Sequence, residues 1–454
     1  NRKIRFWRDA MRNTIENILI KVESLTVLKD LLKYEVVLKF IRLLEAVTGN
    51  TEDSREFVRC YSEFFHGLLE CRIDSESSET NSFGDYLANL LMYTETPVSR
   101  MAERNDSAKL PGWAEDALKR ELDIIGEMAS MSSRMIKAAW LEKHGKDAKE
   151  TIDSLPEWEN RVSEGSMFES AGAWGECSDR LLDFYRKCGS GIFARYNGFI
   201  WEHEGSRGIL RGVDNPDPIR LSDFIGYEMQ RKEIVDNTLR FLKGYPANNL
   251  LLYGDRGTGK SSTVKALLNE YHHLGLRLIE VPKEYLQDFT QIVRLVRNRP
   301  QKFIIFIDDL SFSDEENTYT ALKAVLEGSL ESRPSNIIVY ATTNRRHLIR
   351  ERFSDRTGLA TGNENDEIHA ADTIQEKLSL ADRFGITITF TAPDQEEYLK
   401  IVEELAKKRG IAVEREILRK KAVQWEMLYN GRSPRTALQF INWLEGTLKT
   451  DGKY

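Results

Sequence analysis

The sequence has few of the features that identify a secreted, metal-binding or membrane protein. Its 454 residues include four cysteines without a CxxC spacing or clustered histidines: Cys60, Cys71, Cys177 and Cys188. This argues against a disulfide framework or a zinc site and favours buried thiols. No apolar run approaches the ~18 residues that a membrane span needs, and no signal-peptide core is recognisable. We expect no membrane partner and a cytoplasmic location, and because the chain begins with Asn1 rather than Met, its true N-terminus is expected to be missing.

An excess of positive charge is also lacking. Lysine and arginine number 65 against 72 acidic residues, a net charge of −7. Composition therefore gives no electrostatic reason to expect a nucleic acid partner, although local basic patches remain compatible with it. Hydrophobic residues make up 41% and charged residues 30%, as in soluble globular proteins, and the length allows two or three domains.

The first part of the chain has the apolar spacing of helices. Apolar residues recur at helical intervals between Ile18 and Leu44, and further helices are predicted at 55–71, 113–143 and 175–187. We predict a mostly helical N-terminal domain over residues 1–204 that binds an unidentified protein partner. Residues 191–201 alternate like a short strand or hairpin, and two prolines in Asn215-Pro-Asp-Pro indicate a linker over residues 205–218.

After the linker, strand and helix patterns alternate. This alternation predicts an α/β domain with a parallel sheet covered by helices on both faces, over residues 219–392. The expected strands are short, apolar and rich in β-branched residues, as strands buried on both faces must be; they span 249–253, 276–281, 303–307, 337–341 and 386–390. Residues 393–454 again have helical spacing and are predicted to form a small C-terminal domain.

A glycine-rich motif follows the first of these strands and precedes a predicted helix over residues 262–271. It fits G-x-x-x-x-G-K-[ST] without a mismatch, in the strand–helix context of a P-loop. Glycines let backbone N–H groups turn toward phosphates, and the helix N-terminus adds a positive field. We therefore predict an ATP·Mg²⁺ site in which Lys260 neutralises phosphate charge and the Ser261 hydroxyl holds Mg²⁺. The nucleotide-binding set is Gly254, Asp255, Arg256, Gly257, Thr258, Gly259, Lys260, Ser261 and Ser262.

Two carboxylates end the strand over residues 303–307. Asp308 is predicted to hold Mg²⁺ through water, in the arrangement known as Walker B, and Asp309 to polarise the attacking water. Taken alone, the pair would more simply be a strand end with solvated acids, but the P-loop upstream favours the catalytic interpretation.

Residues 221–446 resemble an AAA+ ATPase, and more narrowly an uncharacterised prokaryotic family of predicted AAA+ ATPases with a helical N-terminal region. The resemblance implies an AAA+ P-loop core with a helical C-terminal lid, adenine contacts from Ile225 and Gly226, and a sensor 1 role for Asn344 in Ala-Thr-Thr-Asn. A helix cap is the alternative for Asn344.

The resemblance also implies roles for two arginines. Arg383, in Leu-Ala-Asp-Arg-Phe-Gly, stands where branch-migration motors carry the arginine finger that completes a neighbouring subunit's site. It implies a homo-oligomer, with a surface ion pair as the alternative and Arg352 and Arg356 as rival candidates. Arg435, in Gly-Arg-Ser-Pro-Arg, matches sensor 2, which reaches the γ-phosphate of its own subunit; the alternative is an ordinary arginine at a helix start.

Three features depart from the family pattern. Asp309 stands where most active members have Glu, which indicates slow hydrolysis or use of ATP as a switch. Residues 281–303 lack an aromatic–hydrophobic–glycine loop that would grip a polypeptide, which argues against an unfoldase. A polar insertion over residues 355–373 is long enough to be a partner-contacting loop; a metal cluster of Glu367, His369 and Asp372 is the weaker interpretation.

Three hypotheses of function follow. The leading one is an ATP-hydrolysing AAA+ enzyme that remodels a partner bound by the N-terminal helices. The second is an ATP-dependent assembly switch or loader scaffold with very slow hydrolysis. The third is a DNA-associated motor, favoured by the similarity around Arg383 but not by the charge.

Overall fold

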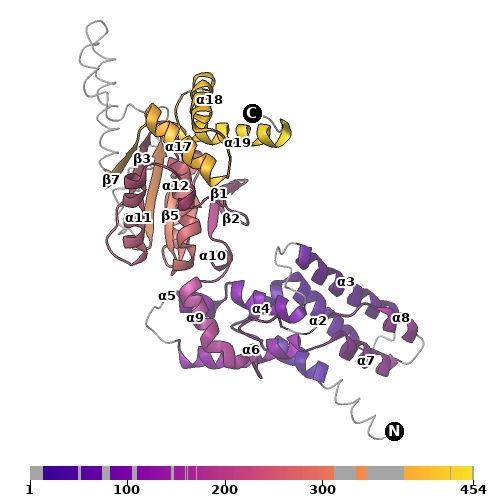
Figure 1. Cartoon of the computed structure of the whole chain (residues 1–454). Helices are drawn as coiled ribbons and strands as arrows, with labels where there is room; N and C mark the ends of the chain where they lie inside the picture. Colours follow the sequence, from indigo (N-terminus) through magenta and orange to yellow (C-terminus); the bar gives the residue numbers. More distant parts are fainter. Residues whose placement is uncertain are drawn as a thin grey trace. The chain divides into compact units, whose positions relative to one another are not determined.

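The chain divides into two compact units, Asn1–Arg195 and Tyr196–Tyr454 (Figure 1). The computed structural model describes residues 14–49, 53–73, 82–104, 110–144, 148–158, 160, 162–169, 171–310, 334–344, 383–429 and 431–451. The rival arginines Arg352 and Arg356 and the insertion over residues 355–373 lie outside the described residues. No helix in the described ranges is long and apolar enough to cross a membrane.

The N-terminal unit is helical, as the sequence predicted. Its regular elements are η1 (Lys29–Lys33), α2 (Glu35–Thr48), α3 (Ser54–Ile73), α4 (Phe83–Tyr93), α5 (Pro97–Arg104), α6 (Gly112–Ala129), α7 (Ser133–His144), α8 (Lys149–Ser154), η2 (Trp174–Cys177), α9 (Ser178–Cys188) and α10 (Ile192–Arg195). The single helix predicted over 113–143 is in fact two, α6 and α7, and α10 takes up part of the stretch predicted as a strand.

Aromatic packing and one buried carboxylate organise this unit. Phe64 packs edge-on against Phe83 and Trp158, with ring centroids 5.1 and 5.0 Å away. The fully buried Glu121 on α6 accepts hydrogen bonds from the Thr26 hydroxyl at 2.6 Å and from the backbone N–H groups of Thr26 and Leu28 at 2.9 and 2.8 Å. These bonds replace the water that a buried carboxylate loses, and they fix the chain that leads into η1.

The C-terminal unit is built on a seven-stranded sheet in the order β2-β1-β4-β5-β6-β3-β7. The strands are β1 (Gly198–Glu204), β2 (Arg207–Val213), β3 (Leu250–Gly254), β4 (Leu276–Glu280), β5 (Lys302–Ile307), β6 (Ile337–Thr343) and β7 (Ile386–Phe390). All neighbours from β1 to β7 pair in parallel, and only β2 is antiparallel. The predicted parallel sheet is therefore confirmed, and all five predicted strands lie in it.

The β1–β2 hairpin corrects the predicted domain boundary. Residues 205–218 were expected to be a linker, but β2 lies within them and pairs along its full length with β1. The unit boundary accordingly falls after Arg195 rather than near residue 205. Two glycines of β2 permit this pairing. A Cβ at Gly208 would lie 2.1 Å from the Trp201 ring, and a Cβ at Gly212 would lie 2.1 Å from the Tyr196 ring.

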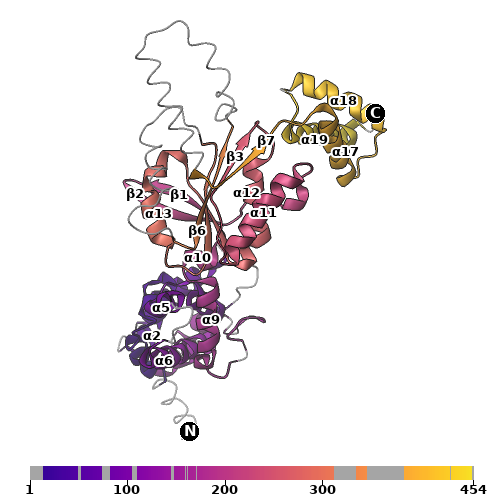
Figure 2. The same cartoon turned by 90° about the vertical axis from the view of Figure 1, so that its left-hand side faces the viewer.

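Helices cover both faces of the sheet. One face carries α11 (Glu228–Leu242) and α12 (Lys260–Tyr271), and the other carries α13 (Phe289–Val296), which follows the short helices η4 (His272–Leu274) and η5 (Lys283–Asp288) (Figure 2). On β5, Ile304 and Phe306 pack with α11 and α12, while Phe303 and Ile305 are equally buried on the opposite face. This explains why the strand is apolar at every position.

Three helices form the C-terminal lid: α17 (Gln395–Lys408), α18 (Arg415–Leu428) and α19 (Pro434–Asp451). Asp394 and Glu397 form a capping box that starts α17, with hydrogen bonds of 2.8 and 3.2 Å. The lid has its own core, which includes Tyr398, Phe440 and Leu444. The predicted fold, an α/β P-loop core with a helical lid after a helical N-terminal region, is confirmed.

Candidate functional site

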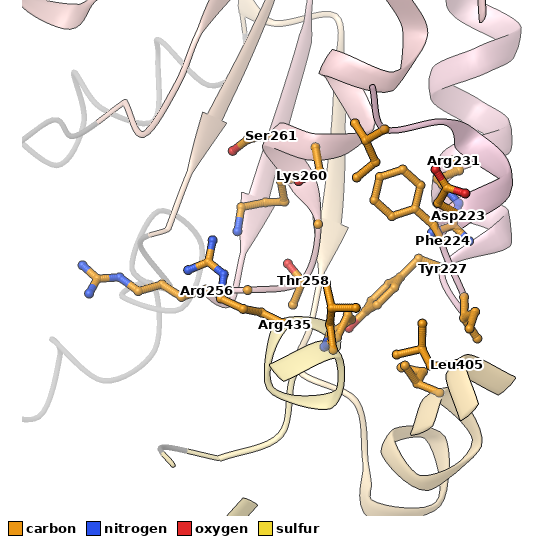
Figure 3. Close-up of a pocket in the computed structure, with 18 of the residues that line it drawn as sticks. Asp223, Phe224, Tyr227, Arg231, Arg256, Thr258, Lys260, Ser261, Leu405 and Arg435 are labelled. Atoms are coloured by element: carbon orange, nitrogen blue, oxygen red, sulfur yellow. The ribbon is translucent and has the colours of Figure 1, made fainter. Parts of the chain in front are cut away.

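A cavity of about 880 Å³ lies between the carboxyl ends of the parallel strands and the lid (Figure 3). Ligands of open parallel sheets bind at this edge. Its lining comes from the segment before α11, the glycine-rich loop, the ends of β5 and β6, and one side of α17 and α19: Ile219, Asp223, Phe224, Ile225, Tyr227, Arg231, Arg256, Gly257, Thr258, Gly259, Lys260, Ser261, Ser262, Asp308, Asp309, Asn344, Ile401, Leu405, Lys408, Arg409, Pro434, Arg435 and Leu438.

The glycine-rich loop adopts a backbone that its glycines make possible. Gly254, Gly257 and Gly259 have φ of +136°, +76° and +90°, a region that other residues rarely enter. A Cβ at Gly254 would also lie 2.0 Å from the Phe390 carbonyl oxygen, so the loop passes directly against β7. Helix α12 begins immediately afterwards at Lys260, which places a helix N-terminus at the cavity, a favourable position for an anion.

Lys260 is the central cation of the cavity. It is 5% exposed, and its Nζ donates to the carbonyl oxygens of Gly254 at 3.1 Å and Asp255 at 2.7 Å and to Asn344 Oδ1 at 2.9 Å. Burial lowers the pKa of Lys260 to about 8, and the neighbouring Arg435 adds to the decrease, while nearby carboxylates oppose it. A buried ammonium whose hydrogen-bond acceptors here are all uncharged oxygens is suited to an incoming phosphate.

Ser261 and Asp308 meet at the same end of the cavity. The Ser261 hydroxyl donates to Asp308 Oδ1 at 2.5 Å, and Thr342 on β6 donates to the same oxygen at 2.6 Å. The contact joins the P-loop helix to the end of β5, as the motifs predicted. Hydroxyl and carboxylate oxygens are the ligands that Mg²⁺ prefers.

Asp309 and Asn344 form a chain with Lys260. Asn344 Nδ2 donates to Asp309 Oδ1 at 2.6 Å, while its Oδ1 accepts from Lys260. Asp309 has φ of +48°, one of two positive values among the described residues other than glycine. The predicted water-activating carboxylate and the predicted sensor 1 amide are therefore in direct contact.

The opposite end of the cavity is apolar. Phe224, Ile225 and Tyr227 from the segment before α11 face Ile401 and Leu405 of α17. Figure 3 shows Phe224 and Tyr227 at this end, away from Ser261 and Lys260. An apolar slot next to a cationic loop suits a flat base joined to phosphates.

A buried arginine supports this apolar end. The Arg231 guanidinium lies 5.4 Å from the centroid of the Phe224 ring and donates to the Gly226 carbonyl oxygen. Burial lowers the pKa of Arg231 from its ordinary value. The arginine thus holds both the ring and the backbone turn at Gly226, so the segment that resembles the adenine-binding strand has a fixed shape.

The lid touches the P-loop directly. The Arg435 backbone N–H donates to the Gly257 carbonyl oxygen at 3.1 Å, and a Cβ at Gly257 would lie 2.8 Å from Ser433 Oγ. The Arg435 side chain extends toward Lys260, whereas Arg256 is exposed and points away from the apolar end (Figure 3). Asp255 ties the loop to the segment between β7 and α17, because its Oδ2 accepts from Ala392 N at 2.7 Å.

Most of the predicted site residues gather in this cavity, with two kinds of exception. Gly254, Asp255 and Gly226 lie just behind its wall, where their backbone groups hold Lys260 and Arg231. Arg383 lies just before β7, half-buried, and is not among the residues that line the cavity. A finger that serves a neighbouring subunit is expected to lie outside its own subunit's site, so its role stays a prediction.

Sequence reasoning missed several functional candidates. The main ones are Thr342, Phe224, Arg231 and two residues of one face of α17, Ile401 and Leu405. The i,i+4 spacing of the α17 pair was visible in the sequence, but not which surface that face meets. Thr342 was visible in the Ala-Thr-Thr-Asn motif, where the prediction used only the asparagine.

The residues present fit ATP with Mg²⁺. Gly257 and Gly259 line the cavity with positive φ, a backbone that brings the loop close to a phosphate. The oxygen pair of Ser261 and Asp308 suits a divalent cation that also binds phosphates. Lys260 and Arg435 supply positive charge from two different elements.

Comparison with known proteins shows partial similarities. The chain is 24% identical over 225 residues to the Holliday junction branch migration complex subunit RuvB of Mycoplasmopsis pulmonis, covering 49% of this chain and 64% of the relative. It is 27% identical over 225 residues to a putative 26S proteasome regulatory subunit homolog of Methanocaldococcus jannaschii, covering 47% and 55%. The chain thus spans less than two thirds of these curated relatives.

Among solved structures, a variant of RuvB from Thermotoga maritima matches with a TM-score of 0.36 and 18% identity, over 51% of this chain and 66% of that one. Residues 194–448 match the family described as "Protein of unknown function (DUF815)". The predicted resemblance to an uncharacterised family of AAA+ ATPases is thereby confirmed. Because the match covers more than half of the 454 residues, the chain belongs to the DUF815 family.

Proposed function

We propose that the chain binds ATP·Mg²⁺ in this cavity and hydrolyses it slowly, as an AAA+ ATPase whose nucleotide state changes its contact with a partner. The observation that carries the proposal is the joining of three separate motifs by hydrogen bonds: Ser261 to Asp308, and Lys260 through Asn344 to Asp309. Chance proximity of a glycine-rich turn and two acids would not give these contacts at one end of a cavity whose other end is apolar.

In this proposal the roles follow from the geometry. The loop N–H groups, Lys260 and Arg435 hold the phosphates, while Phe224 and Ile401 enclose the base. Ser261 and Asp308 would hold Mg²⁺, which supplies charge neutralisation at the phosphates when bound. Asp309 accepts the proton of the attacking water, and Asn344 orients that water.

The alternative function, an assembly switch with hydrolysis only as a slow reset, is favoured by one specific contact. The Asp309 carboxylate is bound through Oδ1 to Asn344 Nδ2 at 2.6 Å, so only its other oxygen, Oδ2, can accept a proton from water without breaking this bond. A DNA-associated motor takes its support from the similarity to RuvB, but the net charge of −7 gives it none.

Binding is tested by calorimetric titration of Mg·ATP into the wild type, Lys260→Ala and, as a matched control, Lys265→Ala. Lys265 lies on the same helix and pairs with Glu280 at 3.1 Å, outside the cavity. We expect Lys260→Ala to lose binding by at least about 10²-fold, because a charge-assisted phosphate contact contributes about 3 kcal/mol. Equal affinity of wild type and Lys260→Ala would refute the site.

Turnover separates the functional alternatives. The ATPase rate is measured against protein concentration, with and without duplex DNA. Cooperative activation without DNA supports the enzyme, ATP-induced assembly with a flat and near-zero rate supports the switch, and stimulation by DNA supports the motor. Asp309→Asn should retain ATP binding and stop turnover, since an amide cannot accept the proton; wild-type turnover by this variant would exclude Asp309 as the base.

A further inference from the structure

Thr342, near the end of β6, is bound to three consecutive residues at the end of β5. Its hydroxyl donates to Asp308 Oδ1 at 2.6 Å and accepts from Asp309 N at 3.0 Å. Its carbonyl oxygen accepts from Leu310 N at 2.7 Å. The threonine is 2% exposed, so these contacts are shielded from competing water.

The sheet register brings Thr342 to this position. Strands β5 and β6 pair in parallel with Ile307 opposite Ala341. The residues that follow these two, Asp308 and Thr342, are therefore also neighbours. A hydroxyl has one proton to donate and lone pairs that accept. Here the proton goes to the carboxylate and a lone pair takes the Asp309 N–H, so both capacities of the side chain are used.

The contacts of Thr342 restrict both acidic residues of the site, Asp308 and Asp309. Asp308 Oδ1 accepts from Ser261, Thr342 and the Asp309 N–H. The Ser261 hydroxyl is the one expected to turn toward Mg²⁺, so Thr342 is the side chain that keeps the Asp308 carboxylate from rotating. The bond to Asp309 N also holds the positive φ of +48°, a conformation that costs free energy for any residue other than glycine.

We propose that Thr342 is a positioning residue of the nucleotide site, which fixes the orientation of the metal-binding Asp308 and the backbone of Asp309. The inference rests on the proposed function, since it assigns Thr342 a task toward ATP·Mg²⁺. Partners that orient metal-binding carboxylates typically contribute about 10–100-fold to metal affinity or activity.

The neighbouring Thr343 provides a matched control. It is fully buried on the same strand, and alternation along the strand directs its side chain to the opposite face of the sheet. Its hydroxyl has no hydrogen-bond partner within the described residues. The change from threonine to valine thus removes one buried hydroxyl at either position. At Thr342 this hydroxyl contacts Asp308 and Asp309, whereas at Thr343 it does not.

The experiment compares Thr342→Val, Thr342→Ser and Thr343→Val with the wild type. The main measurement is the affinity for a non-hydrolysable ATP analogue, by calorimetry, in Mg²⁺ and in EDTA. We expect Thr342→Val to lose about 10–100-fold of the gain in affinity that Mg²⁺ provides, while its affinity in EDTA is unchanged. Thr342→Ser keeps the hydroxyl and should stay within about threefold of the wild type, and Thr343→Val should match the wild type.

Unchanged affinity in EDTA also shows that the variant folds. The Asp309 N–H keeps Asp308 Oδ1 at 3.1 Å as a partner in Thr342→Val, so no buried donor is left unpaired. A wild-type response to Mg²⁺ in Thr342→Val, or an equal loss in Thr342→Ser or Thr343→Val, would overturn the positioning role. Failure of the wild type itself to bind the analogue would instead overturn the proposed function.

Discussion

Replacing Lys260 by methionine should stabilise the nucleotide-free protein although it removes nucleotide binding. Lys260 is 5% exposed and burial lowers its pKa to about 8, with a further decrease from the charge of Arg435. At neutral pH the folded protein therefore carries an ammonium that the unfolded chain would accommodate better. Methionine has a similar length and volume and brings no charge to the same position.

The magnitude follows from the change in pKa. A decrease from 10.5 to about 8 corresponds to roughly 3 kcal/mol of lost stability, at 1.36 kcal/mol per pH unit. Methionine also gives up the hydrogen bonds of Nζ. The Asp255 carbonyl keeps the Thr258 hydroxyl at 2.8 Å, and Asn344, the third acceptor, is only half-buried and can bind water instead. Mainly the Gly254 carbonyl therefore loses a partner, at about 1 kcal/mol. The net gain is about 2 kcal/mol, or roughly 4–8 °C in the melting temperature of a unit of this size.

Scanning calorimetry at several pH values measures this effect. The transition of the unit Tyr196–Tyr454 should shift in Lys260→Met, and that of Asn1–Arg195 serves as the internal control. The lowered pKa means that the unfolded state binds more protons between pH 8 and 10.5, so the wild type gains stability as the pH rises through this range. The difference between variant and wild type should shrink there. A Lys260→Met protein that is less stable than the wild type at pH 7 would refute the reasoning.

Three further predictions concern other parts of the chain. Glu121→Gln should lower the melting temperature of the N-terminal unit alone by the equivalent of about 2 kcal/mol, because a buried carboxylate loses charge-assisted bonds to Thr26 and Leu28; calorimetry measures this, with Asp30→Asn as a control on the nearby η1. Asp255→Ala should speed amide hydrogen exchange at Ala392 by about tenfold, since it removes the acceptor of that N–H, a bond of about 1.4 kcal/mol. Arg383→Ala should bind ATP normally but hydrolyse it about 10³-fold more slowly, and mixing it with Asp309→Asn subunits should restore activity; a mixture that co-assembles without activity would exclude a role across an interface.

The sheet core and the polar end of the site could be predicted because both depend on local patterns. A strand buried on both faces must be short and apolar, which located all five core strands. The motif from Gly254 to Ser261 predicts its own loop, and parallel strands end at one edge, which predicted that Asp308 meets Ser261. Polar groups at consecutive strand ends are close in any sheet of this order.

The second strand of the hairpin and the lid contacts could not be predicted because they depend on non-local packing. Strand β2 has glycines at positions 208 and 212. The need for glycine there is evident only from the structure, in which the rings of Trp201 and Tyr196 leave no room for a Cβ. In the same way, the spacing of Ile401 and Leu405 predicts a helix face, but only the position of the lid shows that this face closes the cavity. The role proposed for Thr342 could not be predicted either, since it depends on the register between β5 and β6.

The backbone at Asp309 connects the departure from the family pattern with the chemistry of the site. Aspartate tolerates a positive φ better than glutamate, because its short side chain can hydrogen-bond locally. With φ of +48°, the aspartate is therefore matched to the turn that Thr342 holds. In this state its carboxylate is bound to Asn344, and Asn344 in turn to Lys260.

A γ-phosphate at Lys260 competes with Asn344 for the same ammonium. We infer that this competition couples the two functions of the site: phosphate binding draws Lys260 away from Asn344, whose Oδ1 then becomes available to a water molecule. In the proposed function this coupling would tie the activation of water to the binding of ATP, because the residues that bind phosphate and those that activate water share one chain of hydrogen bonds.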